Sequence, residues 1–139
     1  MEINKTLFKL LESEIVSGME PYKNSTIKDI MTSYCDEIRE DKLGNLIGLK
    51  KGLKRDFNIM LCAHMDEIGL MVKQIDDKGF IRFAFVGGVD PRILPAQQVI
   101  IHGKEKVAGI IGSKPPHLQE AEERKKVLQT DEMFIDTGL

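Results

Sequence analysis

The chain has 139 residues, of which 42% are hydrophobic and 30% are charged, and its formal net charge is −2. This length suits one domain or two small ones. The weak negative charge argues against a partner such as nucleic acid or an anionic membrane, since proteins of those classes usually carry a basic excess. The first residues lack a signal-peptide pattern, and no apolar run approaches the roughly 20 residues of a membrane span. We therefore expect a cytoplasmic protein.

The first third of the chain predicts two helices and a strand pair. Apolar residues recur at helical spacing over residues 4–14 and again over 22–34. Residues 36–41 then indicate an edge strand, and 46–49 a second strand that returns after a glycine-containing turn. The α-helical and β patterns together predict an α/β fold for this part of the chain.

Residues 57–63 are continuously apolar, unlike a strand that faces water on one side. Such a run is typical of a strand that lies inside a sheet and is covered on both faces. A second apolar run over 68–75 and a third over 80–86 flank a turn at 76–79, as in a β-hairpin. We therefore expect an interior strand at 57–63, followed by a β-rich region.

The final third of the chain predicts short strands and irregular loops. Strand patterns occur at 99–102, 107–111 and 133–136, and the consecutive prolines at 115–116 exclude regular helix or central strand. Residues 119–127 indicate a short charged helix or a turn. The chain stops just after a strand, with no closing helix and no polar tail, so we expect a truncated domain.

The two cysteines, Cys35 and Cys62, do not form a C-x-x-C pair, and we expect both to be reduced thiols. Cys62 lies two residues before His64, so strand alternation would place both side chains on one face. A free cysteine more often packs as a small hydrophobe, and we expect Cys62 to be buried.

His64 and Asp66 follow the apolar run of 57–63 and form a His-x-Asp pair at its end. An imidazole in this position can bind a metal through one ring nitrogen, while a nearby carboxylate holds the other nitrogen and fixes the tautomer. A single His at the end of a strand is more often a structural residue, and the triplet alone is weak evidence. From the residues, both interpretations stay open.

Six segments, in order along nearly the whole chain, carry a family resemblance. They are Ser17-Gly18 with Glu20, Asp41-x-Leu43-Gly44-Asn45, Ala63-His64-Met65-Asp66-Glu67-Ile68-Gly69, Gly87-Gly88-x-Asp90-Pro91-Arg92, Gly112-Ser113-Lys114-Pro115-Pro116-His117 and Phe134-Ile135-Asp136-x-Gly138. With these segments, the chain resembles the N-terminal portion of the M42 family of metallo-aminopeptidases, which form tetrahedral, TET-type dodecamers.

The resemblance implies that residues 1–69 are the N-terminal part of a catalytic α/β domain. Residues 70–139 would be an incomplete, β-rich, PDZ-like domain that is inserted into it and mediates dimerisation. Members of the family remove N-terminal residues from peptides with two divalent metal ions, zinc or cobalt. By match, His64 is a ligand of one metal and Asp66 is the carboxylate that orients it.

In the family, the other metal ligands and the catalytic Glu follow the inserted domain, beyond the residues matched here. A catalytic zinc typically takes three protein ligands, and this chain holds one. We therefore expect the 139-residue chain alone to bind metal weakly at most and to be inactive. The sequence leaves two alternatives open, namely a non-catalytic module for assembly or dimerisation and an independent small domain in which His64 is structural.

Overall fold

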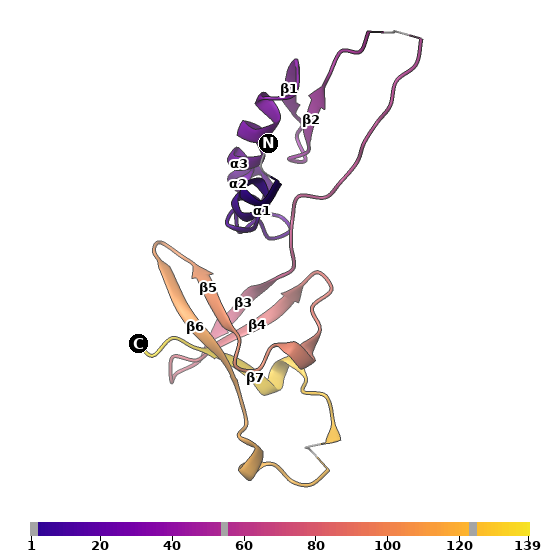
Figure 1. The fold of residues 1–139 in the computed structure, drawn as a ribbon. Helices are drawn as coiled ribbons and strands as arrows, with labels where there is room; N and C mark the ends of the chain where they lie inside the picture. Colours follow the sequence, from indigo (N-terminus) through magenta and orange to yellow (C-terminus); the bar gives the residue numbers. More distant parts are fainter. Residues whose placement is uncertain (1–2, 54–55, 123–124) are drawn as a thin grey trace. The chain divides into compact units, whose positions relative to one another are not determined.

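The computed structural model describes residues 3–53, 56–122 and 125–139, and it separates into two compact units (Figure 1). Unit 1 comprises residues 1–67 and unit 2 comprises residues 68–139. The predicted division at 69/70 falls close to this division. That the units are a catalytic portion and an inserted dimerisation domain stays a prediction. Among the helices of the described ranges, none is long and apolar enough to cross a membrane.

Unit 1 begins with helical structure, as predicted, but the second predicted helix is divided. The helices are α1 (Ile3–Leu11), α2 (Glu20–Lys23) and α3 (Ser25–Thr32). Asn24 separates α2 from α3 and is 7% exposed. The single helix expected over 22–34 is therefore wrong. The physical reason is local, because asparagine is a poor residue for a helix interior and is favoured at helix ends.

The predicted strand pair of unit 1 is confirmed as an antiparallel hairpin of β1 (Glu37–Glu40) and β2 (Leu46–Leu49). The Asp41 carboxylate holds its turn, because it accepts hydrogen bonds from the Leu43 and Asn45 amides at 2.9 and 3.0 Å and from Asn45 Nδ2 at 2.8 Å. Above all the side-chain hydrogen bond from Asn45, and then that from its main chain, lowers the pKa of Asp41. Gly44 completes the turn with a φ of +88°, a conformation that favours glycine.

Residues 57–63 do not form the interior strand that their composition predicts. The structure assigns them neither helix nor strand, and Met60 and Leu61 are 85% and 92% exposed. The expected burial of Cys62 is wrong for the same reason, since its side chain is exposed. A strand is stabilised by pairing with neighbours, and no described segment pairs with this one. The apolar run thus lacks the sheet that its sequence is suited to enter.

Unit 2 is a five-stranded antiparallel sheet, and its strand order is β3-β4-β7-β6-β5. The expected strands are confirmed with small shifts at their ends. Their bounds are β3 Gly69–Ile75, β4 Ile81–Val86, β5 Gln98–His102, β6 Lys106–Ser113 and β7 Met133–Asp136. The 3-10 turns η1 (Pro91–Ile93), η2 (Pro116–Leu118) and η4 (Thr130–Glu132) occupy the connections. In the described part of 119–127 the chain turns, and residues 123–124 lie outside the described residues.

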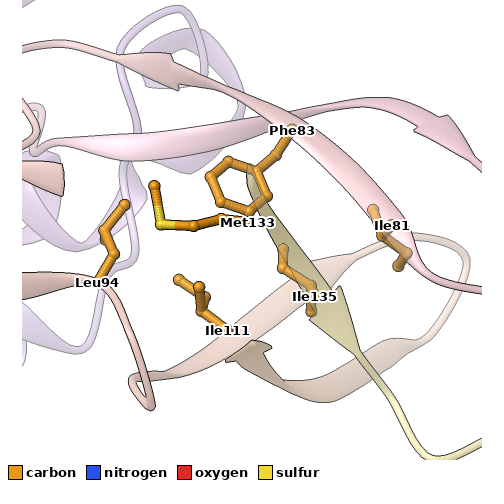
Figure 2. Packing of buried hydrophobic residues seen from close by; sticks show 6 residues of the cluster. All are labelled: Ile81, Phe83, Leu94, Ile111, Met133 and Ile135. Atoms are coloured by element: carbon orange, nitrogen blue, oxygen red, sulfur yellow. The ribbon is translucent and has the colours of Figure 1, made fainter. Parts of the chain in front are cut away.

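One hydrophobic cluster forms the core of unit 2 (Figure 2). Met133 is fully buried, and Ile111 is 1% exposed. The other buried members are Ile81, Phe83, Leu94 and Ile135. These side chains come from β4, β6, β7 and the residue that follows η1, so the core forms only when all of these segments are assembled.

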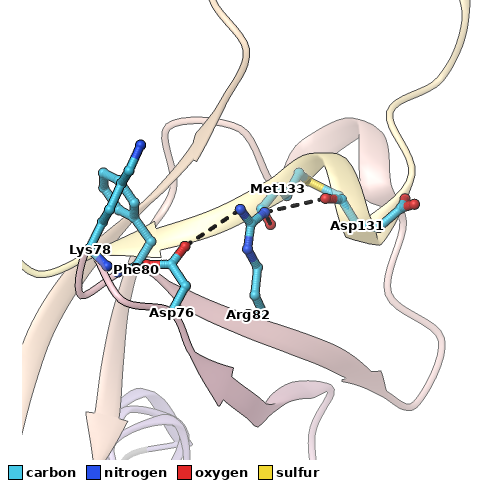
Figure 3. Close-up of polar contacts among 6 residues, drawn as sticks. All are labelled: Asp76, Lys78, Phe80, Arg82, Asp131 and Met133. Atoms are coloured by element: carbon cyan, nitrogen blue, oxygen red, sulfur yellow. Dashed lines mark hydrogen bonds and ion pairs between the residues drawn. The ribbon is translucent and has the colours of Figure 1, made fainter.

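Arg82 links β4 to the chain that enters β7 (Figure 3). Its Nη1 donates hydrogen bonds to the main-chain oxygens of Asp131 and Met133 at 3.3 and 3.2 Å. Its Nη2 lies 3.7 Å from Asp76 Oδ2, and the guanidinium lies 5.8 Å from the centre of the Phe134 ring. These contacts orient the start of β7 from a residue that is about 50 positions earlier in the sequence.

Asp90 caps η1, because its Oδ1 accepts a hydrogen bond from the Arg92 amide at 3.0 Å. The Arg92 guanidinium also donates to both carboxylate oxygens, at 2.6 Å for the Nη2 contact with Oδ2. The side-chain hydrogen bonds from Arg92, followed by that from its main chain, lower the pKa of Asp90 to about 2. This pair fixes the chain where it leaves β4 and turns toward Leu94 in the core.

Replacing the core residue Ile111 with alanine should destabilise unit 2 by about 2–5 kcal/mol, because it removes buried methyl groups and leaves a cavity. The matched control is Ile110→Ala on the same strand, since Ile110 is 51% exposed whereas Ile111 is 1% exposed. We expect the control to cost less than about 1 kcal/mol. Urea unfolding, followed by the NMR signals of β6, measures both. Equal losses for the two variants would contradict this assignment of the core.

Removing the guanidinium in Arg92→Ala should raise the pKa of Asp90 from about 2 toward the ordinary value of 3.8. A carboxyl group whose pKa is lower in the folded than in the unfolded state stabilises the fold above its unfolded pKa. That stabilisation is lost as the pH falls toward about 2. As the pH is lowered, the free energy of unfolding of unit 2 should therefore fall less in Arg92→Ala than in the unchanged protein. NMR titration of the Asp90 carboxyl carbon, with Lys104→Ala as the control, measures the shift.

Candidate site at His64

An apolar groove in unit 1 lies beside the His-x-Asp pair. The groove has a volume of about 430 Å³. It is lined by residues of α1 (Leu10 and Leu11), of the turn after it (Ser13 and Ile15), of α3 (Ile27 and Met31), of β2 (Leu46), and by Leu61, Ala63, His64, Met65, Asp66 and Glu67. The sequence predicted a site at the end of a strand. The structure instead places His64 on a non-strand segment that borders helices.

The chain beyond His64 is fixed to unit 1 through Glu67. The Glu67 amide donates a hydrogen bond of 2.7 Å to the main-chain oxygen of Ile15, and a parallel bridge joins Val16 to Glu67. Ile15 is 1% exposed, and it is the apolar residue of unit 1 that is most completely buried among the described residues. The position of Asp66 is therefore set by the buried part of this unit.

His64 Nδ1 lies 2.8 Å from the main-chain oxygen of Asp66 and 3.5 Å from its Oδ1. A carbonyl oxygen only accepts hydrogen bonds, so Nδ1 is the donor and carries the proton. The neutral ring then has its lone pair on Nε2, the atom that is free to bind an electrophile or a metal. That the Asp66 carboxylate orients the ring stays a prediction, and the main-chain carbonyl of the same residue makes the closer contact with Nδ1.

Sequence reasoning missed the carbonyl contact because a main-chain oxygen has no residue type that reveals it. The signal that was available is the spacing of two residues, which lets the chain turn back on the ring. The His64 side chain is 85% exposed, whereas that of Asp66 is 30% exposed. The imidazole thus projects from the protein while the group that orients it is partly enclosed.

The described residues contain no metal-binding cluster. Over 3–53, 56–122 and 125–139, no group of three or more His, Cys, Asp or Glu side chains is arranged to hold a metal ion. The tautomer of His64 fits a ligand role, since a metal-binding His usually donates its other ring N–H to a carbonyl or carboxylate. One imidazole, however, does not complete a catalytic zinc site, which typically has three protein ligands.

Comparison with known proteins defines the family. Residues 44–139 match the family model of the M42 glutamyl aminopeptidases. The chain is 39% identical over 133 residues to the lysyl aminopeptidase of Pyrococcus furiosus, covering 94% of this chain and 38% of that protein. The chain belongs to the M42 peptidase family.

Solved structures agree with this assignment. A TET aminopeptidase from a marine sediment archaeon of the Thaumarchaeota has a TM-score of 0.86 and 36% identity, and the match covers 99% of this chain and 39% of that chain. A TET peptidase of Pyrococcus horikoshii, which can assemble into a tetrahedron or a large octahedral shell, has a TM-score of 0.74 and 36% identity, covering 96% and 40%. The chain therefore spans about two fifths of the length of these relatives.

The contact between His64 and Asp66 predicts the tautomer of the ring. In the neutral ring, the nitrogen NMR shifts of His64 should show a proton on Nδ1 and none on Nε2. Asp66→Ala keeps the main-chain carbonyl and should keep this tautomer. A change to Nε2–H in Asp66→Ala would show that the carboxylate, at 3.5 Å, holds the ring instead.

Proposed function

We propose that this chain contributes to a metal-dependent aminopeptidase that removes N-terminal residues from peptides. The observation that carries the proposal is the geometry of His64, whose Nδ1 donates to the Asp66 carbonyl at 2.8 Å and whose Nε2 is left free. Membership of the M42 family supplies the reaction class. The relatives are longer, so activity is proposed for an assembly that includes this chain and not for these residues alone.

In this proposal His64 is a ligand of one of two divalent metal ions, zinc or cobalt. When bound, such ions supply Lewis acidity toward a peptide carbonyl and lower the pKa of water. The contribution of this chain is to present Nε2 in the correct tautomer and to hold the ring. Asp66 acts as a positioning residue, through its main-chain oxygen at 2.8 Å and its carboxylate at 3.5 Å.

The assembled protein is proposed to be a cytoplasmic homo-oligomer. The Pyrococcus horikoshii relative can assemble into a tetrahedron or a large octahedral shell, and a further solved TET1 structure, with 34% identity and a TM-score of 0.77, is a dodecamer. One observation favours a second function, in which the chain is a non-catalytic assembly module. Unit 2 has its own buried core, so it has the packing needed to fold without a complete catalytic domain.

The two functions differ in what a hybrid enzyme would do. In the hybrid, these 139 residues replace the matching portion of the Pyrococcus furiosus lysyl aminopeptidase. We expect zinc- or cobalt-dependent cleavage of amino-acid anilides by the hybrid and none by the 139-residue chain alone. In the hybrid, His64→Ala should lower kcat/KM by at least about 100-fold, because loss of a ligand removes several kcal/mol of transition-state stabilisation.

The matched control is His117→Ala, which removes an exposed imidazole from η2 in unit 2. We expect the control to retain the activity of the hybrid. A folded hybrid that is equally active with and without His64 would exclude the ligand role. A folded hybrid without activity would favour the assembly module.

A further inference from the structure

A second pocket lies within unit 2, and its lining shares no residue with the groove beside His64. It has a volume of about 260 Å³ and is formed by η1 and by the chain ahead of η4. Its lining combines three basic side chains with four apolar ones, namely Arg92, Lys125 and Lys126 with Pro91, Pro95, Val127 and Leu128. A concave apolar surface with a few converging charged groups is the usual composition of a small-molecule site.

The wall formed by η1 is fixed at both ends. Asp90 caps η1 and holds the Arg92 guanidinium through Nε and Nη2, at 3.0 and 2.6 Å. At the other end, Ala96 has a φ of +67°, and its amide donates a hydrogen bond of 2.8 Å to the main chain of β6. A residue other than glycine keeps such a conformation only where the surrounding structure holds it. Pro95, which precedes Ala96, is therefore held in place beside the pocket.

The opposite wall is held by the residues that begin η4. Gln129 Nε2 donates a hydrogen bond to the Val127 main-chain oxygen at 3.0 Å, and the Gln129 amide donates to Glu132 Oε2 at 2.6 Å. These bonds fix the path of the chain over 127–129, just before η4 and β7. The Val127 side chain is 47% exposed, so it is accessible to a ligand.

The described acidic residues neutralise only part of the basic charge. Asp90 occupies Nε and Nη2 of Arg92, and Nη1 has no hydrogen-bond partner among the described residues. Glu122 lies 2.9 Å from Lys125 Nζ, but these side chains are 76% and 71% exposed, so water weakens the pair. Lys126 forms no ion pair with a described residue. Three basic and two acidic groups leave a positive surplus, which favours an anionic ligand.

We propose that this pocket binds a carboxylate that is carried on a small apolar group. The free edge of the Arg92 guanidinium and the ammonium of Lys126 match the oxygens of a carboxylate. The prolines and Val127 match an apolar group beside it. The volume of about 260 Å³ lies below the roughly 300–1,000 Å³ of pockets for drug-sized ligands, so we infer a ligand the size of one amino acid. The proposal is independent of the proposed function, because the pocket lies in unit 2 and uses none of the residues near His64.

The test is an NMR titration of the 139-residue chain with N-acetyl-leucine, which carries one carboxylate on a branched apolar group. We expect saturable shifts of the amides of Arg92 and Lys126. N-acetyl-leucinamide keeps the apolar group without the charge, and inorganic phosphate keeps a charge without the apolar group. Each should bind at least about ten-fold more weakly, because it lacks one of the two kinds of contact. No saturable shift with N-acetyl-leucine, or equal affinity for all three probes, would overturn the proposal.

A charge reversal tests the basic side chains. Lys126→Glu should raise the Kd for N-acetyl-leucine at least about ten-fold, because it replaces an attraction with a repulsion. The matched control is Lys104→Glu, which makes the same change at an exposed residue between β5 and β6. The control should stay within about two-fold of the unchanged protein, since Lys104 does not line the pocket and salt screens distant exposed charges. Equal losses in the two variants would show that only net charge matters and would overturn the proposal.

A polar substitution tests the apolar wall. Val127→Ser should raise the Kd for N-acetyl-leucine about three-fold, because it removes apolar surface from the contact. The matched control is Val72→Ser on β3, since Val72 and Val127 are 46% and 47% exposed. The NMR signals of β4 and β7 report whether each variant keeps the fold of unit 2. A folded Val127→Ser variant with unchanged affinity would overturn the apolar part of the proposal.

A free acid and the end of a peptide chain share the chemistry of this ligand. Titration with N-acetyl-glycyl-glycyl-leucine distinguishes them, because its carboxylate and apolar group are the same but a peptide precedes them. Tighter binding than that of N-acetyl-leucine would support a site for chain ends, and weaker binding would support a site for small free acids. The acetyl group blocks the N-terminus in both probes, so the measurement is independent of any aminopeptidase activity.

Discussion

The central position of β7 is the constraint on which the structure of unit 2 depends. Met133 and Ile135 of this strand lie in the core, and β7 pairs with β4 on one side and with β6 on the other. Without β7, the β3–β4 and β5–β6 hairpins would lack the strand that joins them into one sheet. Ile111 of β6 would also lose Ile135, the residue with which it is paired on β7. An isolated two-stranded hairpin is marginally stable at best in water. Arg82 reinforces this arrangement by binding the main chain at the entrance to β7.

Unit 1 depends more on local interactions than unit 2 does, and it has a smaller buried core. Its helices and its hairpin form as local interactions direct, with the turn at Asp41 as the clearest example. Ile15, however, is its most deeply buried apolar side chain among the residues that the structure describes, and several apolar residues of α1 are exposed. Helical stability in proteins comes mainly from packing of an apolar face rather than from propensity. Unit 1 therefore covers its apolar side chains less completely than unit 2 does, and segment 57–63 pairs with no described strand.

Residue types predicted only part of the candidate site. The pairing of His64 with Asp66 was predictable, because imidazole and carboxylate at this spacing form a recognised combination. The atom that makes the closer contact was not predictable from residue types. The main-chain oxygen of Asp66 lies 2.8 Å from His64 Nδ1, whereas its carboxylate lies 3.5 Å away. Which oxygen reaches the ring depends on the path of the chain from His64 to Glu67. That path is set by the hydrogen bond to Ile15, a residue about 50 positions away in the sequence.

The sequence by itself determined the turns, the strands of unit 2 and the family, because glycine-containing turns, alternating apolar residues and ordered motifs are local properties of the chain. Only the tertiary structure decided that the second helix breaks at Asn24, that β7 lies between β4 and β6, and that the residues over 57–63 are exposed. The physical reason is that strand order and burial depend on contacts between distant segments. An apolar run such as 57–63 shows that a strand is favoured there, but pairing requires a partner strand, which no described segment provides.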